Sequence, residues 1–193
     1  IEARDAAGNT VSELRTVVWE PARVLKLADA KEVQEGQRIS FPLTLSTPGD
    51  VAGLTFRLNY DEQYLTDPKV DLSAVVGQSV NSINIGTIGV ISGSFALAGI
   101  ELPTGIVPVA TVSFRARSVP MVLSTEVAVA IDSLSSANGT TVSVGNATVS
   151  GWGRIKPRRI KGDNNANQRV DIGDATVISR LQVGLDAKRT WDV

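Results

Sequence analysis

The sequence predicts an all-β fold, because alternating residue patterns, few aromatic residues and frequent turn residues all indicate many short strands. Aromatic residues make up only 5% of the 193 residues, whereas hydrophobic residues make up 42%. About eight segments between Ala22 and Gly151 alternate apolar with polar residues and are bounded by turn residues. Each segment would place one face on a core and the other in water, so we expect a β-sandwich.

The alternation is clearest in a few segments, and turn signals accompany them. Thr47-Pro48-Gly49-Asp50 is typical of a tight turn and separates the first two segments. The pair Asn138-Gly139 favours a hairpin, after which the chain returns through Val142 and Val144. The clearest segments cover residues 39–45, 54–60, 110–116 and 127–131.

The two ends of the chain have a different pattern from the sandwich, which we place at residues 21–152. Residues 1–20 resemble the closing strands of a preceding immunoglobulin-like repeat, and the alternative is an extra edge strand or an arm. We expect a basic linker at residues 153–161 and a last unit at residues 162–193. In the last unit, apolar residues recur at helical spacing: Ala175, Ile178, Leu181 and Leu185. Gly184 would end this helix.

The chain contains neither histidine nor cysteine. This excludes Ser-His and Cys-His nucleophile pairs, an imidazole base and the usual zinc ligands. Paired carboxylates remain as a basis for catalysis. One cluster of acidic residues follows a predicted strand: Asp61, Glu62, Asp67 and Asp71. We expect these to be loop residues and predict that the protein is not an enzyme.

A twelve-residue segment carries oxygen side chains at the spacing of an EF-hand-like loop. Positions 1, 3, 5, 9 and 12 are occupied by Asp163, Asn165, Asn167, Asp171 and Asp174. Arg169, at position 7, would contribute only its backbone carbonyl. Carboxylate and amide oxygens suit hard cations, so the sequence predicts a Ca²⁺ site with a helix starting at its last ligand.

Two positions of this loop depart from the usual pattern. Gln168 stands at position 6, where Gly normally allows a sharp turn, and Asp174 replaces the longer Glu at position 12. The alternative to a calcium site is an Asp/Asn-rich turn followed by a helix whose N-cap is Asp171 or Asp174.

The segment from Asp163 to Leu185 resembles the first repeat of a dockerin, and Trp191-Asp192-Val193 resembles the start of a second repeat. The resemblance implies a calcium-binding loop and helix that associate with a protein partner. In that family, positions 10 and 11 of the loop help to select the partner. Here they are Ile172 and Gly173, in place of the frequent Ser or Thr.

Two stretches of the predicted sandwich resemble strands of a cohesin. They are Val51-Ala52-Gly53-Leu54-Thr55-Phe56-Arg57-Leu58-Asn59-Tyr60-Asp61 and Ile106-Val107-Pro108-Val109-Ala110-Thr111-Val112-Ser113-Phe114. The resemblance covers the length of the predicted sandwich. It implies a jelly-roll-like sandwich of nine strands that serves as a protein-binding module or spacer.

We therefore predict a non-catalytic, calcium-stabilised assembly module, extracellular or at the cell surface, with a cohesin- or dockerin-type protein or copies of itself as partner. One alternative is a structural subunit of a head-to-tail filament or surface layer. Another is a carbohydrate-binding module, which would bind a cell-surface glycan but needs an exposed row of aromatic residues. The net charge of −1 argues against nucleic acid, and no apolar run is long enough for a membrane span.

Two further patterns concern the surface. Asn138-Gly139-Thr140 and Asn146-Ala147-Thr148 are N-glycosylation sequons, and we expect Asn138 at an exposed hairpin tip. The three tryptophans, Trp19, Trp152 and Trp191, lie at predicted junctions between modules. There, packing between modules is favoured over stacking on carbohydrate.

Overall fold

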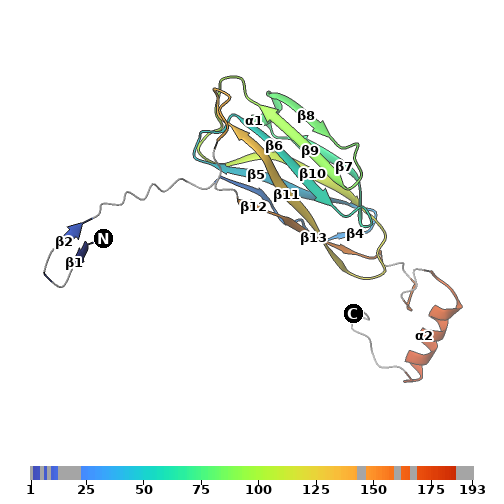
Figure 1. The fold of residues 1–193 in the computed structure, drawn as a ribbon. Helices are drawn as coiled ribbons and strands as arrows, with labels where there is room; N and C mark the ends of the chain where they lie inside the picture. The colour runs from blue at the N-terminus through green and yellow to red at the C-terminus, as the bar shows by residue number, and fades with distance from the viewer. Residues whose placement is uncertain are drawn as a thin grey trace.

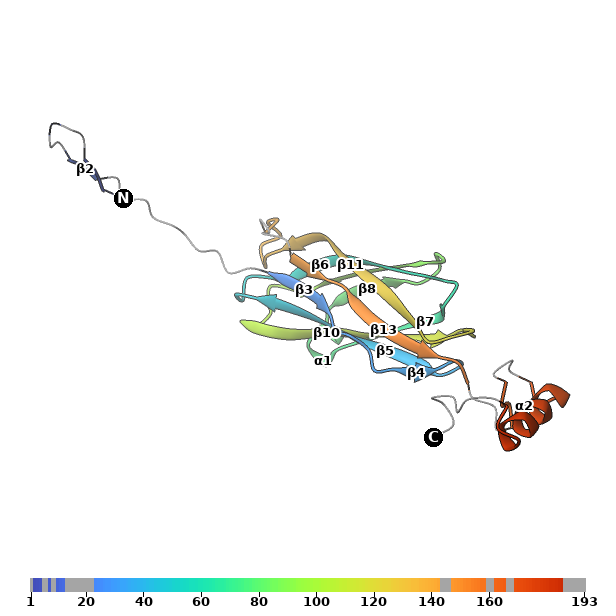
Figure 2. The ribbon, with the colours of Figure 1, turned by 90° about the horizontal axis from the view of Figure 1, so that it is seen from below.

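The computed structural model describes residues 2–4, 7, 10–12, 23–142, 147–158, 162–165 and 169–185. Two β-sheets pack face to face to form a sandwich, as Figure 1 and Figure 2 show from two directions. The prediction of an all-β sandwich is confirmed. Neither described helix has the length that a bilayer-spanning helix requires.

The first sheet has five strands in the order β12-β3-β5-β10-β7. Their bounds are β12 Ala147–Val149, β3 Val24–Leu27, β5 Arg38–Thr47, β10 Gly105–Ala116 and β7 Leu65–Leu72. The second sheet has six strands in the order β4-β13-β11-β6-β9-β8. Their bounds are β4 Val33–Gln34, β13 Gly151–Lys156, β11 Leu123–Ser135, β6 Gly53–Tyr60, β9 Val90–Ala96 and β8 Val80–Asn84.

The sandwich has eleven strands, two more than the nine that the cohesin resemblance implies. One addition is β4, which is only two residues long. The other arises because the last strand divides at Ser150: β12 pairs with β3 in one sheet, and β13 pairs with β11 in the other. The number becomes nine when β4 is omitted and β12 and β13 are counted together. β13 continues to Lys156, beyond the predicted sandwich end at residue 152.

Among the described residues, two further strands and two helices lie outside the two sheets. β1 (Glu2–Arg4) and β2 (Thr10–Ser12) form an antiparallel hairpin. Much of the 1–20 segment, including Trp19, lies outside the described residues, so its resemblance to an immunoglobulin-like repeat stays a prediction. The helices are α1 (Ala74–Gly77), after β7, and α2 (Ile172–Gln182), beyond β13.

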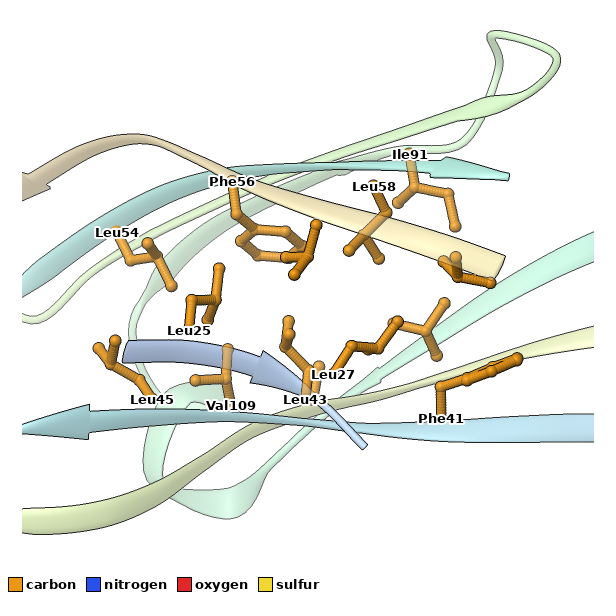
Figure 3. Close-up of a cluster of buried hydrophobic side chains, with 14 of the residues drawn as sticks. Leu25, Leu27, Phe41, Leu43, Leu45, Leu54, Phe56, Leu58, Ile91 and Val109 are labelled. Atoms are coloured by element: carbon orange, nitrogen blue, oxygen red, sulfur yellow. The ribbon is translucent and has the colours of Figure 1, made fainter. Parts of the chain in front are cut away.

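The core lies between the sheets and is built by the alternation seen in the sequence. On β5, Ile39, Phe41, Leu43 and Leu45 are fully buried, whereas the residues between them are partly or fully exposed. Figure 3 shows Phe41, Leu43 and Leu45 of β5 facing side chains of β6, including Phe56. Because branched and aromatic side chains from both sheets fill the layer between them, the strands form a stable platform for the outer surfaces.

Candidate functional site

The predicted calcium loop precedes α2, and its last residues form the start of that helix. Asp171 is the N-cap, and its Oδ1 accepts a hydrogen bond from the backbone N of Gly173 at 2.8 Å. In return, Oδ2 of Asp174 accepts from the backbone N of Asp171 at 2.7 Å. This reciprocal capping box satisfies amides that the first helical turn leaves unpaired. The helix therefore begins at Ile172, two residues before the predicted start.

Asp174 also ties the beginning of the loop to the helix. Its Oδ1 accepts from the backbone N of Asn164 at 2.6 Å and from that of Asn165 at 3.1 Å, and the residue is only 3% exposed. The backbone hydrogen bond from Asp171 and then those from Asn165 and Asn164 lower the pKa of the Asp174 carboxyl, although burial opposes them. The carboxylate is thus held in its charged form.

The first and last positions of the loop lie side by side. The side chain of Asp163 lies within hydrogen-bonding reach of that of Asp174 and contributes to the lowered pKa of Asp174. A Cβ on Gly173 would lie 2.6 Å from Nδ2 of Asn165 and 2.9 Å from Oδ1 of Asp171, so these two side chains also meet beside Gly173. This closeness explains why a residue without a side chain occupies position 11, a constraint that sequence analysis missed.

The described part of the loop brings oxygen donors together at its two ends. Asn167 and Gln168 lie outside the described residues, and Arg169 is described as exposed. Among the described residues, no group of three or more carboxylates gathers in a geometry that could hold a metal. The oxygen donors that are described nevertheless fit a hard cation in type, because they are carboxylates and amides with the loop ends adjacent. The calcium site stays a prediction.

The helix after the loop ends as the sequence predicts but leaves its apolar residues uncovered. Gly184 has a φ of +73°, and the backbone N of Leu185 donates to the carbonyl of Arg180 at 2.9 Å, which closes the helix. Of its residues only Asp174 is buried. Both ribbon views draw α2 apart from the sandwich.

A second candidate site is the outer face of the six-stranded sheet, away from the core. Its centre consists of small or polar side chains because these alternate with the buried residues of three neighbouring strands. They are Thr55, Arg57 and Asn59 on β6, Ser92 and Ser94 on β9, and Ala128 and Ala130 on β11. Arg57 donates to Oδ1 of Asp132 at 2.6 Å across this face.

Trp152 lies on the same outer face, at the side formed by β13. It pairs in register with Glu126 of β11 and is 50% exposed, and its backbone N donates to Oδ1 of Asp29 at 2.8 Å. A half-exposed tryptophan beside a surface of small and polar side chains is a typical anchor for a protein partner. Trp152 therefore belongs to a sheet face, and Trp191 lies outside the described residues.

The acidic residues that we considered for catalysis do not converge. Oδ1 of Asp61 accepts from the backbone N of Gln63 at 2.8 Å in the turn after β6. Asp67 forms an ion pair with Arg38 at 2.7 Å on β7. Both carboxylates therefore have structural roles.

The first sequon lies where the sequence places it. Asn138 is exposed in the turn between β11 and β12, and its Oδ1 accepts from the backbone N of Thr140 at 3.0 Å. This bond shapes the hairpin tip. Asn146, in the second sequon, lies outside the described residues. Glycosylation of either residue stays a prediction.

No protein-family model matches the chain, and no curated protein matches its sequence. Solved structures do match its fold. The seventh ScaB type I cohesin from Pseudobacteroides cellulosolvens has a TM-score of 0.62 and 16% identity, covering 72% of this chain and 95% of that one. A non-cellulosomal cohesin from the archaeon Archaeoglobus fulgidus has a TM-score of 0.59 and 17% identity, covering 77% of this chain and 100% of that one.

A third match comes from a type I cohesin–dockerin complex, Coh-OlpA with Doc918, from Clostridium thermocellum. It has a TM-score of 0.59 and 13% identity, covering 72% of this chain and 100% of that one. These structures do not test the resemblance of residues 163–185 to a dockerin repeat. The sandwich has the fold of a cohesin module.

Proposed function

We propose that this chain is a non-catalytic protein-assembly module that binds a dockerin-type partner on the outer face of its six-stranded sheet. The observation that carries the proposal is the cohesin fold combined with an outer face of small and polar side chains on β6, β9 and β11. The OlpA cohesin, which shares the fold, forms a complex with a dockerin. A protein partner is therefore the best-supported ligand class.

The six-stranded sheet is favoured over the other outer surface because binding there would desolvate fewer charges. Ala128 and Ala130 leave the backbone of β11 accessible to a partner, and Arg57 is already paired with Asp132. On the outer face of the six-stranded sheet, charge is limited at the centre to the Arg57–Asp132 pair, and Glu126 and Arg154 lie toward β13. The outer face of the five-stranded sheet carries charged side chains on four of its strands: Lys26, Arg38, Asp67, Lys69, Asp71 and Arg115. Charged residues are depleted at the centres of protein interfaces.

Ala130→Arg tests this assignment, because the variant places a second guanidinium beside Arg57 at the centre of the face. Binding to a panel of dockerin modules is measured by biolayer interferometry in the presence of CaCl₂. We expect at least about a tenfold loss of affinity, which corresponds to ~1.4 kcal/mol. Thr111→Arg, exposed on the opposite sheet, is the matched control and should bind like the unaltered chain. Equal effects of both variants, or no binding to any dockerin, would contradict the proposal.

We further propose that residues 163–174 bind Ca²⁺ in an extracellular setting. The ligands would be side-chain oxygens of Asp163, Asn165, Asn167, Asp171 and Asp174, together with the backbone carbonyl of Arg169. The cation would offset repulsion among the carboxylates and order the segment that leads into α2. Three carboxylates and two amides form a modest donor set, suited to the ~10⁻⁴–10⁻³ M range of extracellular calcium modules.

Titration of the full chain with CaCl₂ by calorimetry tests the site. Asp163→Asn should abolish the heat of binding, because it removes the first ligand while leaving the Asp171 and Asp174 capping box in place. Asp132→Asn, which removes a carboxylate from the sandwich surface, is the matched control. Limited proteolysis gives a second measurement: EDTA should speed cleavage after residue 156. Unchanged cleavage together with no binding heat would refute the calcium site.

A further inference from the structure

The edge strand β8 lies within a long stretch of the chain that carries no charge. From Leu72 through Ile100 the sequence contains no Asp, Glu, Lys or Arg. This stretch forms α1, β8 and β9, and β8 is the last strand of the six-stranded sheet, with β9 as its single neighbour among the described strands. Alternate backbone N–H and C=O groups of an edge strand point away from the sheet and can pair with another strand.

The other edges of the two sheets are protected in ways that β8 is not. β7 carries Asp67 and Lys69 on its exposed side, and a shift in register interrupts its pairing with β10. Asp67 also has a φ of +50°, which bends the strand. β4 and β12 are only two and three residues long. Charges, bends and short length are the usual means of blocking edge-to-edge pairing.

Apolar side chains are exposed at both ends of β8. At its start, Val80 is 79% exposed and Ile100 is 66% exposed. They border a mostly apolar hollow of about 380 Å³ that Val75, Leu97 and Leu102 also line, together with the polar Gln78 and Ser79 and the charged Glu101. Beyond its end, in the turn to β9, Ile88 is 74% exposed and Ile85 is also exposed. The strand thus has an apolar hollow at one end and protruding apolar side chains at the other.

We propose that β8 pairs with β8 of a second copy of this chain, antiparallel about a two-fold axis at Ser82. In this register Val80 lies opposite Asn84 of the second copy. Ile85 of that copy then reaches beyond Val80 to the apolar hollow, and the symmetry repeats this contact at the other end. The two ends of the strand are complementary to each other, so a second copy would cover the hollow at one end and the exposed isoleucines at the other at the same time.

The absence of charged residues in β8 also favours a second copy of this chain as its pairing partner. A two-fold axis brings each residue of β8 close to its own counterpart, so any charged residue near the axis would face a like charge. Ser82 and its neighbours Asn81 and Ile83 are uncharged. The pairing would join the two six-stranded sheets into one continuous sheet. It uses the edge of the sheet and leaves the outer face, where the dockerin-type partner is proposed, accessible.

Sedimentation velocity of the full chain tests the proposal over about 1 µM to about 1 mM, a range that covers weak and moderate association. We expect a monomer at low concentration and a mass that levels off at the dimer. Ser82→Lys should abolish the dimer, because two lysines would meet at the axis. Asn59→Lys adds the same charge on the exposed side of β6, away from the edge, and should leave the dimer intact.

Cross-linking gives an independent measurement, because the chain has no cysteine. Ser82→Cys should form a disulfide-linked dimer under mild oxidation, whereas Asn59→Cys should not. Several results would overturn the proposal: a monomer at every concentration, a mass that grows beyond the dimer, or a dimer that Ser82→Lys leaves unchanged. A dimer that Ser82→Cys fails to link would also overturn it.

Discussion

Replacement of Gly93 by Ala should destabilise the sandwich, because no room exists for a side chain at this point of β9. Gly93 pairs in register with Phe56 on β6 and with Ile83 on β8. A Cβ on residue 93 would overlap the Phe56 ring, with Cε1 at 2.6 Å, and would lie 3.0 Å from Cδ1 of Ile83. Phe56 is fully buried in the core, so its ring has no free space into which to turn.

The expected loss follows from two opposing contributions. Forcing an extra methyl into a well-packed core costs about 1–3 kcal/mol. Replacing Gly by Ala in a strand regains about 0.5–1 kcal/mol of backbone entropy. At the centre of these ranges the free energy of unfolding should fall by about 1.3 kcal/mol, and at most by about 2.5 kcal/mol. Each kcal/mol lowers the melting temperature by ~2–4 °C for a chain of this size.

Urea unfolding followed by tryptophan fluorescence measures this change. Phe56→Leu removes the ring atoms that block residue 93, so the Gly93→Ala/Phe56→Leu pair should lose less stability than the sum of the single variants. Gly77→Ala is the matched control, because no atom lies within 4 Å of a Cβ there. It should gain about 0.4–1 kcal/mol. Two results would refute the close contact between residue 93 and Phe56. One is a Gly93→Ala variant as stable as the unaltered chain, and the other is a double variant whose stability loss equals the sum of the two single losses.

Other changes test the charged groups. The hydrogen bond from Arg23 lowers the pKa of Asp50 below 3.8, so the stability from this ion pair is present above that pH and is lost as the pH falls through the lowered pKa. In pH-dependent urea unfolding, the stability difference between the unaltered chain and Asp50→Asn should therefore shrink in acid; a constant difference would contradict this. Asp171→Ala should cost α2 about 1 kcal/mol, seen as faster amide exchange in α2 with the sandwich unchanged; unchanged exchange in α2 would argue against the cap. Asp132→Asn breaks only an exposed ion pair and should change global stability by less than about 1 kcal/mol; a larger loss in urea unfolding would show that the pair is structural.

The strands with a buried and an exposed side were predictable from the sequence. On β5, Phe41 and Leu43 are buried, and Pro42 between them is exposed, as the alternation predicts. β6 behaves in the same way around Phe56. Such strands lie in the interior of their sheets, where burial on one side and water on the other impose a period of two residues.

The edges of the sheets were less predictable. β8 has the sequence Val80-Asn81-Ser82-Ile83-Asn84, in which only Ile83 is part-buried, so no period of two residues appears. The division of the last strand at Ser150 depends on which sheet each half pairs with. That choice is made by contacts with β3 and β11, far away in the sequence, and leaves no local signal.

At the C-terminal loop, the sequence predicted donor types but could not predict how the donors are used. Asp171 was considered both as a calcium ligand and as a helix N-cap, and the described structure has it as the N-cap. The hydrogen bonds from Asn164 and Asn165 to Asp174 depend on the path of the loop, which spacing alone does not determine. Both uses are compatible, because each carboxylate has two oxygens.

Hydrogen–deuterium exchange of the full chain, with and without a dockerin that it binds, tests the assembly function most directly. We predict that protection appears in β6, β9 and β11, whose outward side chains include Arg57, Ser92 and Ala130. β5 and β10, in the opposite sheet, should exchange as in the free chain. Protection confined to β5 and β10, or no protection anywhere in the sandwich, would contradict the proposed binding face.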